Sequence, residues 1–375
     1  MEKVLLTTVF SGYNYGSSLQ ALATKTMLKE LGYDCRLVAM KSLVKGRDIR
    51  IKKLMTILIR SWLIRGNNGT NALSTYKGSY NKVMIGDSVT RFEEFTNKYL
   101  EPQYMSWNSM KRLAKECIAC FAGSDQIWNS STMYVDPLYY LRFASAEKRI
   151  AFAPSFGRDF VADYNKKKMS KWISEFACLS VREDSGIKLI KELTGRDAIH
   201  LVDPTLMVKG ETWKKTLNLQ DKQGNYILTY FLDKPSESAR RAIAELKETL
   251  KCEVIAIPYQ FDDMCYCDKV VPTGPIEFLD LINNAKCVLT DSFHGTAFSI
   301  NLHTPFYVFG RNYGTAHSQN SRIESILKMM NMQDRFEPCH KLDKWDCVDF
   351  NHSEKILTVE RKKSKKYIVE AIGLK

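Results

Sequence analysis

The sequence predicts two doubly wound α/β units arranged in tandem. Its 375 residues, 45% of them hydrophobic, are enough for about two domains with sizeable cores. Short apolar runs bounded by Gly, Pro or Ser alternate with stretches of helical periodicity. Uninterrupted runs of this kind are typical of parallel strands that are covered on both faces. Because parallel sheets bind ligands where their strands end, we expect a ligand at the carboxyl ends of the strands, between two sheets.

The N-terminus shows the alternation of strand, helix and strand most clearly. An apolar run at 4–10 leads through a loop to 17–31, where Leu, Ala and Met recur at helical spacing. Gly32 follows as a helix C-cap, and 35–40 resumes a strand pattern. Further strands are expected at 117–122, 150–153, 178–181, 199–202, 226–232, 254–258, 287–290 and 305–309, with helices at 237–250 and 276–283.

The segment between Asp203 and Asn225 is the expected domain junction. We assign an N-terminal domain to residues 1–205, a C-terminal domain to 206–350 and a basic helix to 351–375. No apolar stretch is long enough to span a bilayer. Most of the ten cysteines lie in strand-like runs, and the C-x-x-C at Cys117 lacks the second pair of a metal site. We expect core cysteines, no metal, and a cytoplasmic location.

The net charge of +13 is concentrated in two segments, 41–65 with a net of +7 and 355–375 with a net of +5. On a helix, 49–65 places Ile51, Leu58 and Trp62 on one side and Lys52, Lys53 and Arg60 opposite. The sequence allows two interpretations: a helix that packs on its own sheet with a solvated basic face, or one that rests on an anionic membrane at its inner face. The C-terminal segment is expected to be a solvated helix face. Nucleic acid is not an expected partner, because no recognition motif accompanies the charge.

The turn after the apolar run at 287–290 is the most informative segment. Asp291 or Ser292 can cap the helix that follows, with His294 and Gly295 at its positive N-terminus. Backbone N–H groups there bind phosphate or carboxylate, and Gly295 allows close approach. His294 can bind an anion or act as a general acid, although a lone histidine is often structural.

The surrounding composition favours a small, highly charged anion as the ligand. No Asp or Glu occurs from 292 to 323, whereas Arg311, Arg322 and the histidines at 294, 303 and 317 all fall there. A site for a nucleotide sugar would use a carboxylate in this region to hold the ribose hydroxyls. The sequence therefore argues against such a donor.

Two turns in the first half carry candidate side chains. After the run at 117–122, Asp125 can accept a hydroxyl proton and Trp128 can stack on a sugar; alternatively, the segment is an Asx turn with Trp128 in the core. After the run at 178–181, Arg182 can offer a bidentate fork to a carboxylate or phosphate. Its alternative role is a salt bridge to Glu183 or Asp184.

Taken together and in order, these segments resemble the polysaccharide pyruvyl transferase family. The matching pieces are 14–23, 123–129, 153–157, 179–186, 202–206 and 290–298. The resemblance implies two Rossmann-like domains whose parallel sheets face a central cleft, as in GT-B glycosyltransferases. It also implies phosphoenolpyruvate as donor and, as product, a pyruvate ketal on a sugar of a surface glycan. Arg182 and His294 match the family's donor-binding or catalytic residues, and Arg311 falls where many members have a basic residue.

The resemblance assigns the acceptor to the N-terminal domain and the donor to the C-terminal domain. The expected residues are His294 and Asp125 for catalysis, Arg182, Ser292, Gly295, Arg311 and Arg322 for the donor, and Asn14, Tyr15, Gln126 and Trp128 for the acceptor. Many members have Arg where this chain has Ser292. No metal or organic cofactor is expected, and the acceptor is expected on a membrane lipid. The alternatives are a glycosyltransferase that uses a nucleotide sugar and a non-catalytic glycan- or lipid-binding relative.

Overall fold

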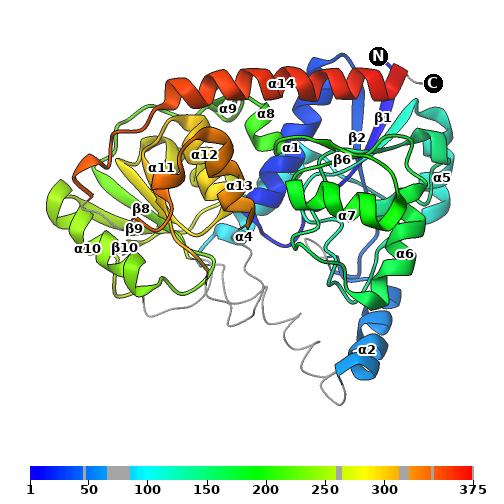
Figure 1. Cartoon of the computed structure of the whole chain (residues 1–375), viewed down its shortest axis with the longest axis horizontal. Coiled ribbons are helices and arrows are strands. Elements are labelled where there is room, and N and C mark those ends of the chain that lie inside the picture. Colours follow the sequence, from blue (N-terminus) through cyan, green and yellow to red (C-terminus); the bar gives the residue numbers. More distant parts are fainter. Residues whose placement is uncertain (45–47, 66–84, 259–263, 312–320, 339–341, 374–375) are drawn as a thin grey trace. The chain divides into compact units, whose positions relative to one another are not determined.

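A computed structural model describes residues 1–44, 48–65, 85–258, 264–311, 321–338 and 342–373 (Figure 1). The chain forms two compact units, which are treated separately below. Unit 1 comprises Met1–Tyr80, Thr96–Met207 and Glu360–Lys375, and unit 2 comprises Asn81–Phe95 and Val208–Val359. The units divide two residues beyond the expected boundary at 205. The expected domains differ from the units in two respects, because 81–95 belongs to unit 2 and the C-terminal helix is shared between both.

Unit 1 is built on a parallel sheet in the order β3-β2-β1-β4-β5, with a separate parallel pair, β6 and β7. Its strands are β1 Lys3–Thr7, β2 Asp34–Met40, β3 Gln103–Met105, β4 Ala119–Ala122, β5 Arg149–Ala151, β6 Ser180–Val181 and β7 Ile199–His200. A single bridge between Ile150 and Cys178 links β5 to the segment before β6. The central strands β1 and β4 are almost fully buried, as the uninterrupted apolar runs predict.

The helices of unit 1 follow its strands. They are α1 Tyr15–Glu30, α2 Ile51–Arg65, α5 Trp107–Glu116, α6 Asp163–Ser174, α7 Asp184–Thr194 and α8 Pro204–Met207. Asn14 caps α1, since its side chain accepts a hydrogen bond from the Ser17 amide at 3.0 Å. Gly32 lies just beyond α1 with a φ of 89°, a conformation that favours glycine. Figure 1 shows α6 and α7 side by side on unit 1.

Unit 2 repeats the scheme with a parallel sheet in the order β10-β9-β8-β11-β12. Its strands are β8 Tyr226–Tyr230, β9 Glu253–Ala256, β10 Lys269–Val270, β11 Cys287–Thr290 and β12 Phe306–Val308. Its helices are α4 Ser88–Phe95, α9 Gly210–Leu217, α10 Glu237–Leu250, α11 Pro275–Asn284, α12 Phe293–Leu302 and α13 Ser321–Met330. The predicted helix at 237–250 has the bounds of α10. The prediction of an α/β fold with two parallel sheets is confirmed.

The last helix, α14 Phe350–Gly373, begins in unit 2 and ends in unit 1. In unit 1 it is partly buried: Arg361 donates from Nε to the Leu206 carbonyl at 2.9 Å, and the Tyr367 hydroxyl donates to the Ala151 carbonyl at 2.7 Å. Lys362 and Lys366 are exposed, so only part of this helix is the expected solvated basic face. None of the described helices is both long and apolar enough to cross a bilayer.

The basic segment at 51–65 forms α2, and its faces are turned opposite to the first of the two interpretations that the sequence allows. The side chains of Lys53 and Arg60 turn toward unit 1, where Lys53 pairs with Asp48 at 2.7 Å and Arg60 donates to the Met133 carbonyl at 3.2 Å. Trp62, by contrast, is 60% exposed. The expectation that α2 packs through its apolar side and leaves its basic side in solvent is therefore wrong.

Candidate functional site

In unit 1, five of the six segments that carry the family resemblance form one buried polar network. Gln20 in α1 donates to Thr8 Oγ1 at 2.8 Å and accepts from the Ser124 amide at 3.1 Å. Ser17 donates to the Asp125 carboxylate at 2.5 Å. Ser155 donates to Glu183, which follows β6, and Thr205 donates to Asp203 at 2.7 Å. The network sits where β1, β4, β5 and β6 end, which is the edge at which parallel sheets bind ligands.

Arg182 lies inside this network and is only 5% exposed. Its Nη1 donates to Asp203, its Nη2 is 3.8 Å from Asp125, and its Nε is 4.0 Å from Glu183. Burial alone would lower the pKa of the guanidinium, but the three carboxylates raise it above its ordinary value. The fork is therefore occupied by the protein's own acids. This corrects the expectation that it is open to a donor. The alternative of a salt bridge to Glu183 is confirmed, and Asp203, which the sequence did not suggest, is a closer partner.

Two residues expected to bind the acceptor belong to the core instead. Trp128 is 0% exposed and stacks on Tyr140 with 5.8 Å between ring centroids, while its Nε1 donates to the Tyr139 carbonyl at 3.2 Å. Tyr15, in the first turn of α1, is 1% exposed. Neither ring can stack on a sugar while it is buried in this way, so the alternative of a core tryptophan is correct.

The other residues expected on the acceptor side remain near the strand ends. Asn14 and Gln126 are half-buried, and Gln126 accepts from Asn129 at 3.1 Å. Asp125 has a left-handed backbone with a φ of 62°, which is uncommon for a residue other than glycine but is tolerated by Asp. It is 8% exposed, and Ser17 and Arg182 fix its carboxylate within the network.

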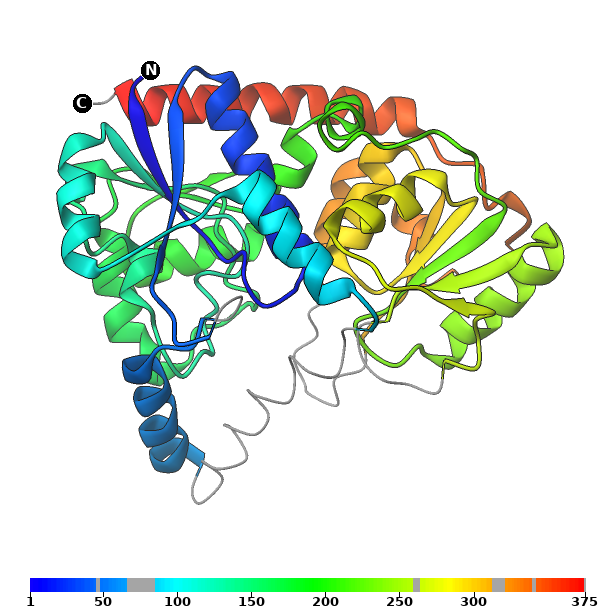
Figure 2. The ribbon, with the colours of Figure 1, turned by 180° about the vertical axis from the view of Figure 1, so that it is seen from behind.

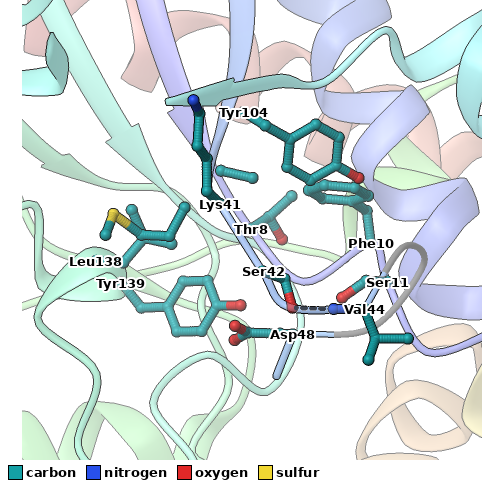
Figure 3. A pocket seen from close by; sticks show the side chains of 12 residues that line it. Thr8, Phe10, Ser11, Lys41, Ser42, Val44, Asp48, Tyr104, Leu138 and Tyr139 are labelled. Atoms are coloured by element: carbon teal, nitrogen blue, oxygen red, sulfur yellow. Dashed lines mark hydrogen bonds between the residues drawn. The ribbon is translucent and has the colours of Figure 1, made fainter. Parts of the chain in front are cut away.

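A pocket of about 290 Å³ opens at the carboxyl ends of β1 and β2, and none of its lining residues was among the predicted site residues (Figure 3). Its lining residues are Thr8, Phe10, Ser11, Ala39, Met40, Lys41, Ser42, Val44, Asp48, Tyr104, Leu138 and Tyr139. The rings of Phe10 and Tyr104 lie together on one wall, with centroids 6.4 Å apart. Thr8 links the pocket to the polar network, because its hydroxyl donates to the Ser124 carbonyl at 3.1 Å. The pocket thus combines aromatic surfaces with hydroxyl groups and a carboxylate.

The carboxylate of the pocket, Asp48, is held in its ionised form. Burial would raise its pKa, but Lys53 and Arg50 together lower it below the ordinary value. In Figure 3 the hydroxyl of Tyr139 points toward this carboxylate. A carboxylate with a lowered pKa is a weak base but a good hydrogen-bond acceptor. Its oxygens already accept hydrogen bonds from Arg50, at 2.6 Å and 2.9 Å, and from Lys53 at 2.7 Å. Asp48 is therefore unsuited to deprotonate a sugar hydroxyl, and a hydroxyl that it held would share these oxygens with the two cations.

In unit 2, the turn from β11 to α12 has the geometry that the sequence predicts. Ser292 is the N-cap, and its hydroxyl accepts from the Gly295 amide at 3.3 Å. His294 occupies the first turn of α12 and is half-buried. A Cβ at Gly295 would come within 2.6 Å of Thr290 Oγ1. Close packing of α12 on β11 is thus a second reason for glycine at this position, and its expected role in admitting a ligand stays a prediction.

Asp291, which the sequence suggested only as a possible helix cap, is a functional candidate in the structure. It is buried, and it accepts hydrogen bonds from the amides of Leu232 at 2.6 Å and Asp233 at 3.0 Å. Arg311, just beyond β12, lies 3.5 Å from it. Burial raises the pKa of Asp291 to about 6, although Arg311 and the two amides act in the opposite direction. Although residues 292–323 include no Asp or Glu, the side chain of Arg311 therefore has the carboxylate of Asp291 beside it.

The remaining basic candidates of unit 2 are dispersed. Arg322 is half-buried in the first turn of α13. His303 lies at the other end of α12 from His294, stacks on Phe350 and is 4.0 Å from Glu354, so it is not part of the same site. His317 lies outside the described residues. Of the residues expected to bind the donor, Arg182 lies in unit 1, whereas Ser292, Gly295, Arg311 and Arg322 lie in unit 2.

Comparison with solved structures finds similar chains at low sequence identity. The protein resembles a putative UDP-N-acetylglucosamine 2-epimerase from Listeria monocytogenes with 10% identity and a TM-score of 0.49, covering 98% of this chain and 90% of that one. The UDP-GlcNAc 2-epimerase from Neisseria meningitidis is 11% identical, with a TM-score of 0.48 and full coverage of both chains. Because these scores are below 0.5, the fold assignment rests on the strand order described above.

Sequence comparisons give a local match and a family match. A stretch of 52 residues is 46% identical to General stress protein 30 of Bacillus subtilis (strain 168), but it covers only 14% of this chain and 15% of that protein. The profile of the family described as Polysaccharide pyruvyl transferase matches residues 14–313, well over half of the chain. That range contains the turn at His294 and, apart from Thr8, Phe10 and Ser11, the residues of the buried network and the pocket. The chain therefore belongs to the polysaccharide pyruvyl transferase family, a family of polysaccharide-modifying transferases.

Proposed function

We propose that this protein transfers pyruvate from phosphoenolpyruvate to two hydroxyls of one sugar in a polysaccharide precursor, forming a cyclic ketal. The observation that carries the proposal is the family match over residues 14–313. Its support in unit 1 is the pocket, which offers aromatic and hydrogen-bonding groups to a sugar. Its support in unit 2 is the positive first turn of α12 with His294, and Arg311 at the same edge of the sheet.

The acceptor is assigned to the pocket of unit 1. Tyr104, which is 46% exposed, offers a ring face to a pyranose, and the mostly buried Phe10 packs against that ring. The ionised Asp48 accepts hydrogen bonds from the sugar hydroxyls. Asp125 stays the proposed base. It directly follows Ser124, whose carbonyl accepts a hydrogen bond from Thr8 in the pocket wall. Arg182 is a positioning residue in this scheme, since it orients Asp125 and Asp203 from within the network.

The donor is assigned to unit 2. Arg311 and Arg322 are the proposed partners of its phosphate and carboxylate, and the first turn of α12 adds the hydrogen-bonding side chains of Ser292 and His294. A bound anion would compete with Asp291 for Arg311, since the two side chains are already 3.5 Å apart. His294 is the proposed general acid.

The chemistry then follows from the enol ester of the donor. His294 gives a proton to the methylene carbon, which makes the central carbon electrophilic, and a sugar hydroxyl adds to that carbon as it loses its own proton. Asp125 takes the proton of this first hydroxyl. The second hydroxyl then attacks the same carbon, the bond to the phosphate oxygen breaks, and inorganic phosphate leaves. The proton of the second hydroxyl restores the one that His294 gave away, and the proton on Asp125 passes through solvent to the released phosphate. Donor, acceptor and two products balance without any oxidant or reductant.

Thermal unfolding with each candidate donor tests the proposal. Phosphoenolpyruvate is expected to raise the melting temperature of the wild-type protein, and Arg311→Gln is expected to abolish that rise. Lys328→Gln, in the later turns of α13, is the matched control and should keep it. A rise with a nucleoside diphosphate and none with phosphoenolpyruvate would favour a nucleotide-sugar transferase and refute the proposal.

A further inference from the structure

The outward face of α2 carries large apolar side chains. Ile51 is 64% exposed, Met55 and Ile59 are each 54% exposed, and Trp62 and Leu63 are 60% and 67% exposed. Their spacing of three or four residues places them along one side of the helix. We call these five residues the α2 apolar face. Figure 2 shows α2 projecting from the rest of unit 1.

Exposed apolar residues are concentrated in this region. In the described part of the chain, half of the large apolar side chains that are exposed fall between 43 and 63, with Leu43 and Val44 preceding the α2 apolar face. Scattered exposed apolar residues are normal in soluble proteins, but a contiguous group marks an interaction surface. A surface of this kind needs a partner that removes it from water.

The opposite side of α2 fixes the direction in which the apolar face points. Arg60 donates from Nη1 to the Met133 carbonyl at 3.2 Å and to Asn165 Oδ1 at 3.0 Å. Arg50, just before the helix, pairs with Asp136, and Ser61 is 1% exposed. Because these polar contacts hold one side of the helix on unit 1, the apolar side is left facing outward.

We propose that the α2 apolar face docks on the surface of a lipid bilayer that contains anionic lipids. The exposed Lys52 follows Ile51 at the start of α2, and the exposed Lys41 lies at the end of β2 in the same basic segment. A face that combines aliphatic side chains, a tryptophan and flanking lysines is suited to the boundary between headgroups and acyl chains. A protein partner would need an acidic rim to match the same charge, and it is treated as an outcome of the test.

The docking surface adjoins the proposed acceptor pocket. Val44 and Asp48 line that pocket, and α2 begins only three residues after Asp48. A unit 1 docked through α2 would therefore hold the pocket close to the bilayer. This link rests on the proposed function: it assigns the acceptor to glycans carried on a membrane lipid, whereas the docking itself does not depend on any activity.

Vesicle flotation with the full chain tests the docking. Wild-type protein is expected to float with vesicles of phosphatidylcholine and phosphatidylglycerol, and the triple variant Met55→Ser/Ile59→Ser/Trp62→Ser is expected to lose at least about tenfold in partitioning. The matched control is Ile199→Ser/Val359→Ser/Val369→Ser, which removes three exposed apolar residues elsewhere and should float like wild type. Circular dichroism and melting curves of both variants establish that they fold.

Further measurements separate the contribution of the lysines to vesicle binding from that of the apolar side chains, and test for a dimer. Lys41→Glu/Lys52→Glu should weaken binding to anionic vesicles and leave the weaker binding to pure phosphatidylcholine unchanged. Wild-type protein that fails to float with either vesicle overturns the proposal, and so does a triple variant that floats like wild type. If light scattering shows a dimer that the triple variant dissociates and no vesicle binding occurs, a second copy covers the face. The melting shift with phosphoenolpyruvate tests the proposed function separately.

Discussion

Arg182 and Asp203 form an ion pair within unit 1, with side chains that are 2% and 0% exposed. Asp125 and Glu183 lie within 4.0 Å of the same guanidinium, so one buried cation faces three buried carboxylates. A buried charge that loses its partner is costly, because neither water nor another cation replaces it. The pair therefore holds together the strand ends on which the candidate acceptor site is built.

The first prediction concerns the stability that this pair provides. Arg182→Met is expected to lower the free energy of unfolding of unit 1 by about 3–5 kcal/mol, because it leaves Asp203 unpaired in the core. Urea unfolding followed by circular dichroism measures the loss. Lys166→Met removes a cation that is 56% exposed and should change the value by less than about 0.5 kcal/mol. Equal midpoints for Arg182→Met and wild type would contradict the structural role.

The second prediction distinguishes a core aromatic residue from one in the pocket. Trp128→Ala should destabilise unit 1 by about 3–5 kcal/mol, since the indole is completely buried. Tyr104→Ala should have little effect on stability, because Tyr104 is 46% exposed, but it should raise the KM for the glycan acceptor. Melting curves and acceptor titrations together measure both effects. A Tyr104→Ala protein with an unchanged acceptor KM would remove that ring from the proposed site.

The third prediction is a pH dependence that arises from Asp291. Folding raises the pKa of its carboxyl to about 6, so the folded state holds the proton more tightly than the unfolded chain does. The penalty for burying the ionised form is absent below about pH 4 and is complete above about pH 6. Wild-type stability relative to Asp291→Asn should therefore fall by roughly 3 kcal/mol as the pH rises from 4 to 7.

Urea midpoints of the two proteins at several pH values measure this difference. Asp233→Asn, which changes a neighbouring acid whose own amide binds Asp291, serves as the control. A stability difference between wild type and Asp291→Asn that is constant across this range would show that Asp291 titrates normally.

The fourth prediction separates two histidines on the same helix. His294→Gln should reduce turnover at least about a hundredfold if His294 supplies the proton to the donor. His303→Gln, at the far end of α12, should leave turnover within about twofold, since His303 stacks on Phe350 and lies outside the proposed site. Steady-state rates of phosphate release, with melting curves to exclude unfolding, measure both. Equal rates for the two variants would remove the catalytic role of His294.

Much of the fold could be predicted from the alternation of apolar runs and helical periods. The run at 287–290 forms β11, and the turn after it positions Ser292 as the helix cap, because both features depend on residues close together in the sequence. The assignment of 81–95 to unit 2 could not be predicted. It depends on contacts with residues far away, such as the hydrogen bond from Arg91 to the Pro272 carbonyl at 3.2 Å.

The sequence predicts which segments form the candidate site, but not which partners their side chains contact or how deeply they are buried. Arg182 was correctly placed after a strand, yet its partner Asp203 is 21 residues away and only the folded sheet brings them together. Trp128 follows β4 in a polar segment, but Tyr140 and Phe156 enclose it. For α2, both sides of the helix carry apolar residues, so periodicity alone could not decide which side packs on unit 1.

The most direct test of the proposed transfer is to follow both products in one reaction. The protein is incubated with phosphoenolpyruvate and lipid-linked glycan intermediates from its own host, and inorganic phosphate and glycan mass are measured together. Release of one phosphate for each pyruvate ketal formed, abolished in His294→Gln, is the predicted result. No phosphate release and no mass increase with any of these acceptors, with a nucleotide sugar consumed in its place, would contradict it.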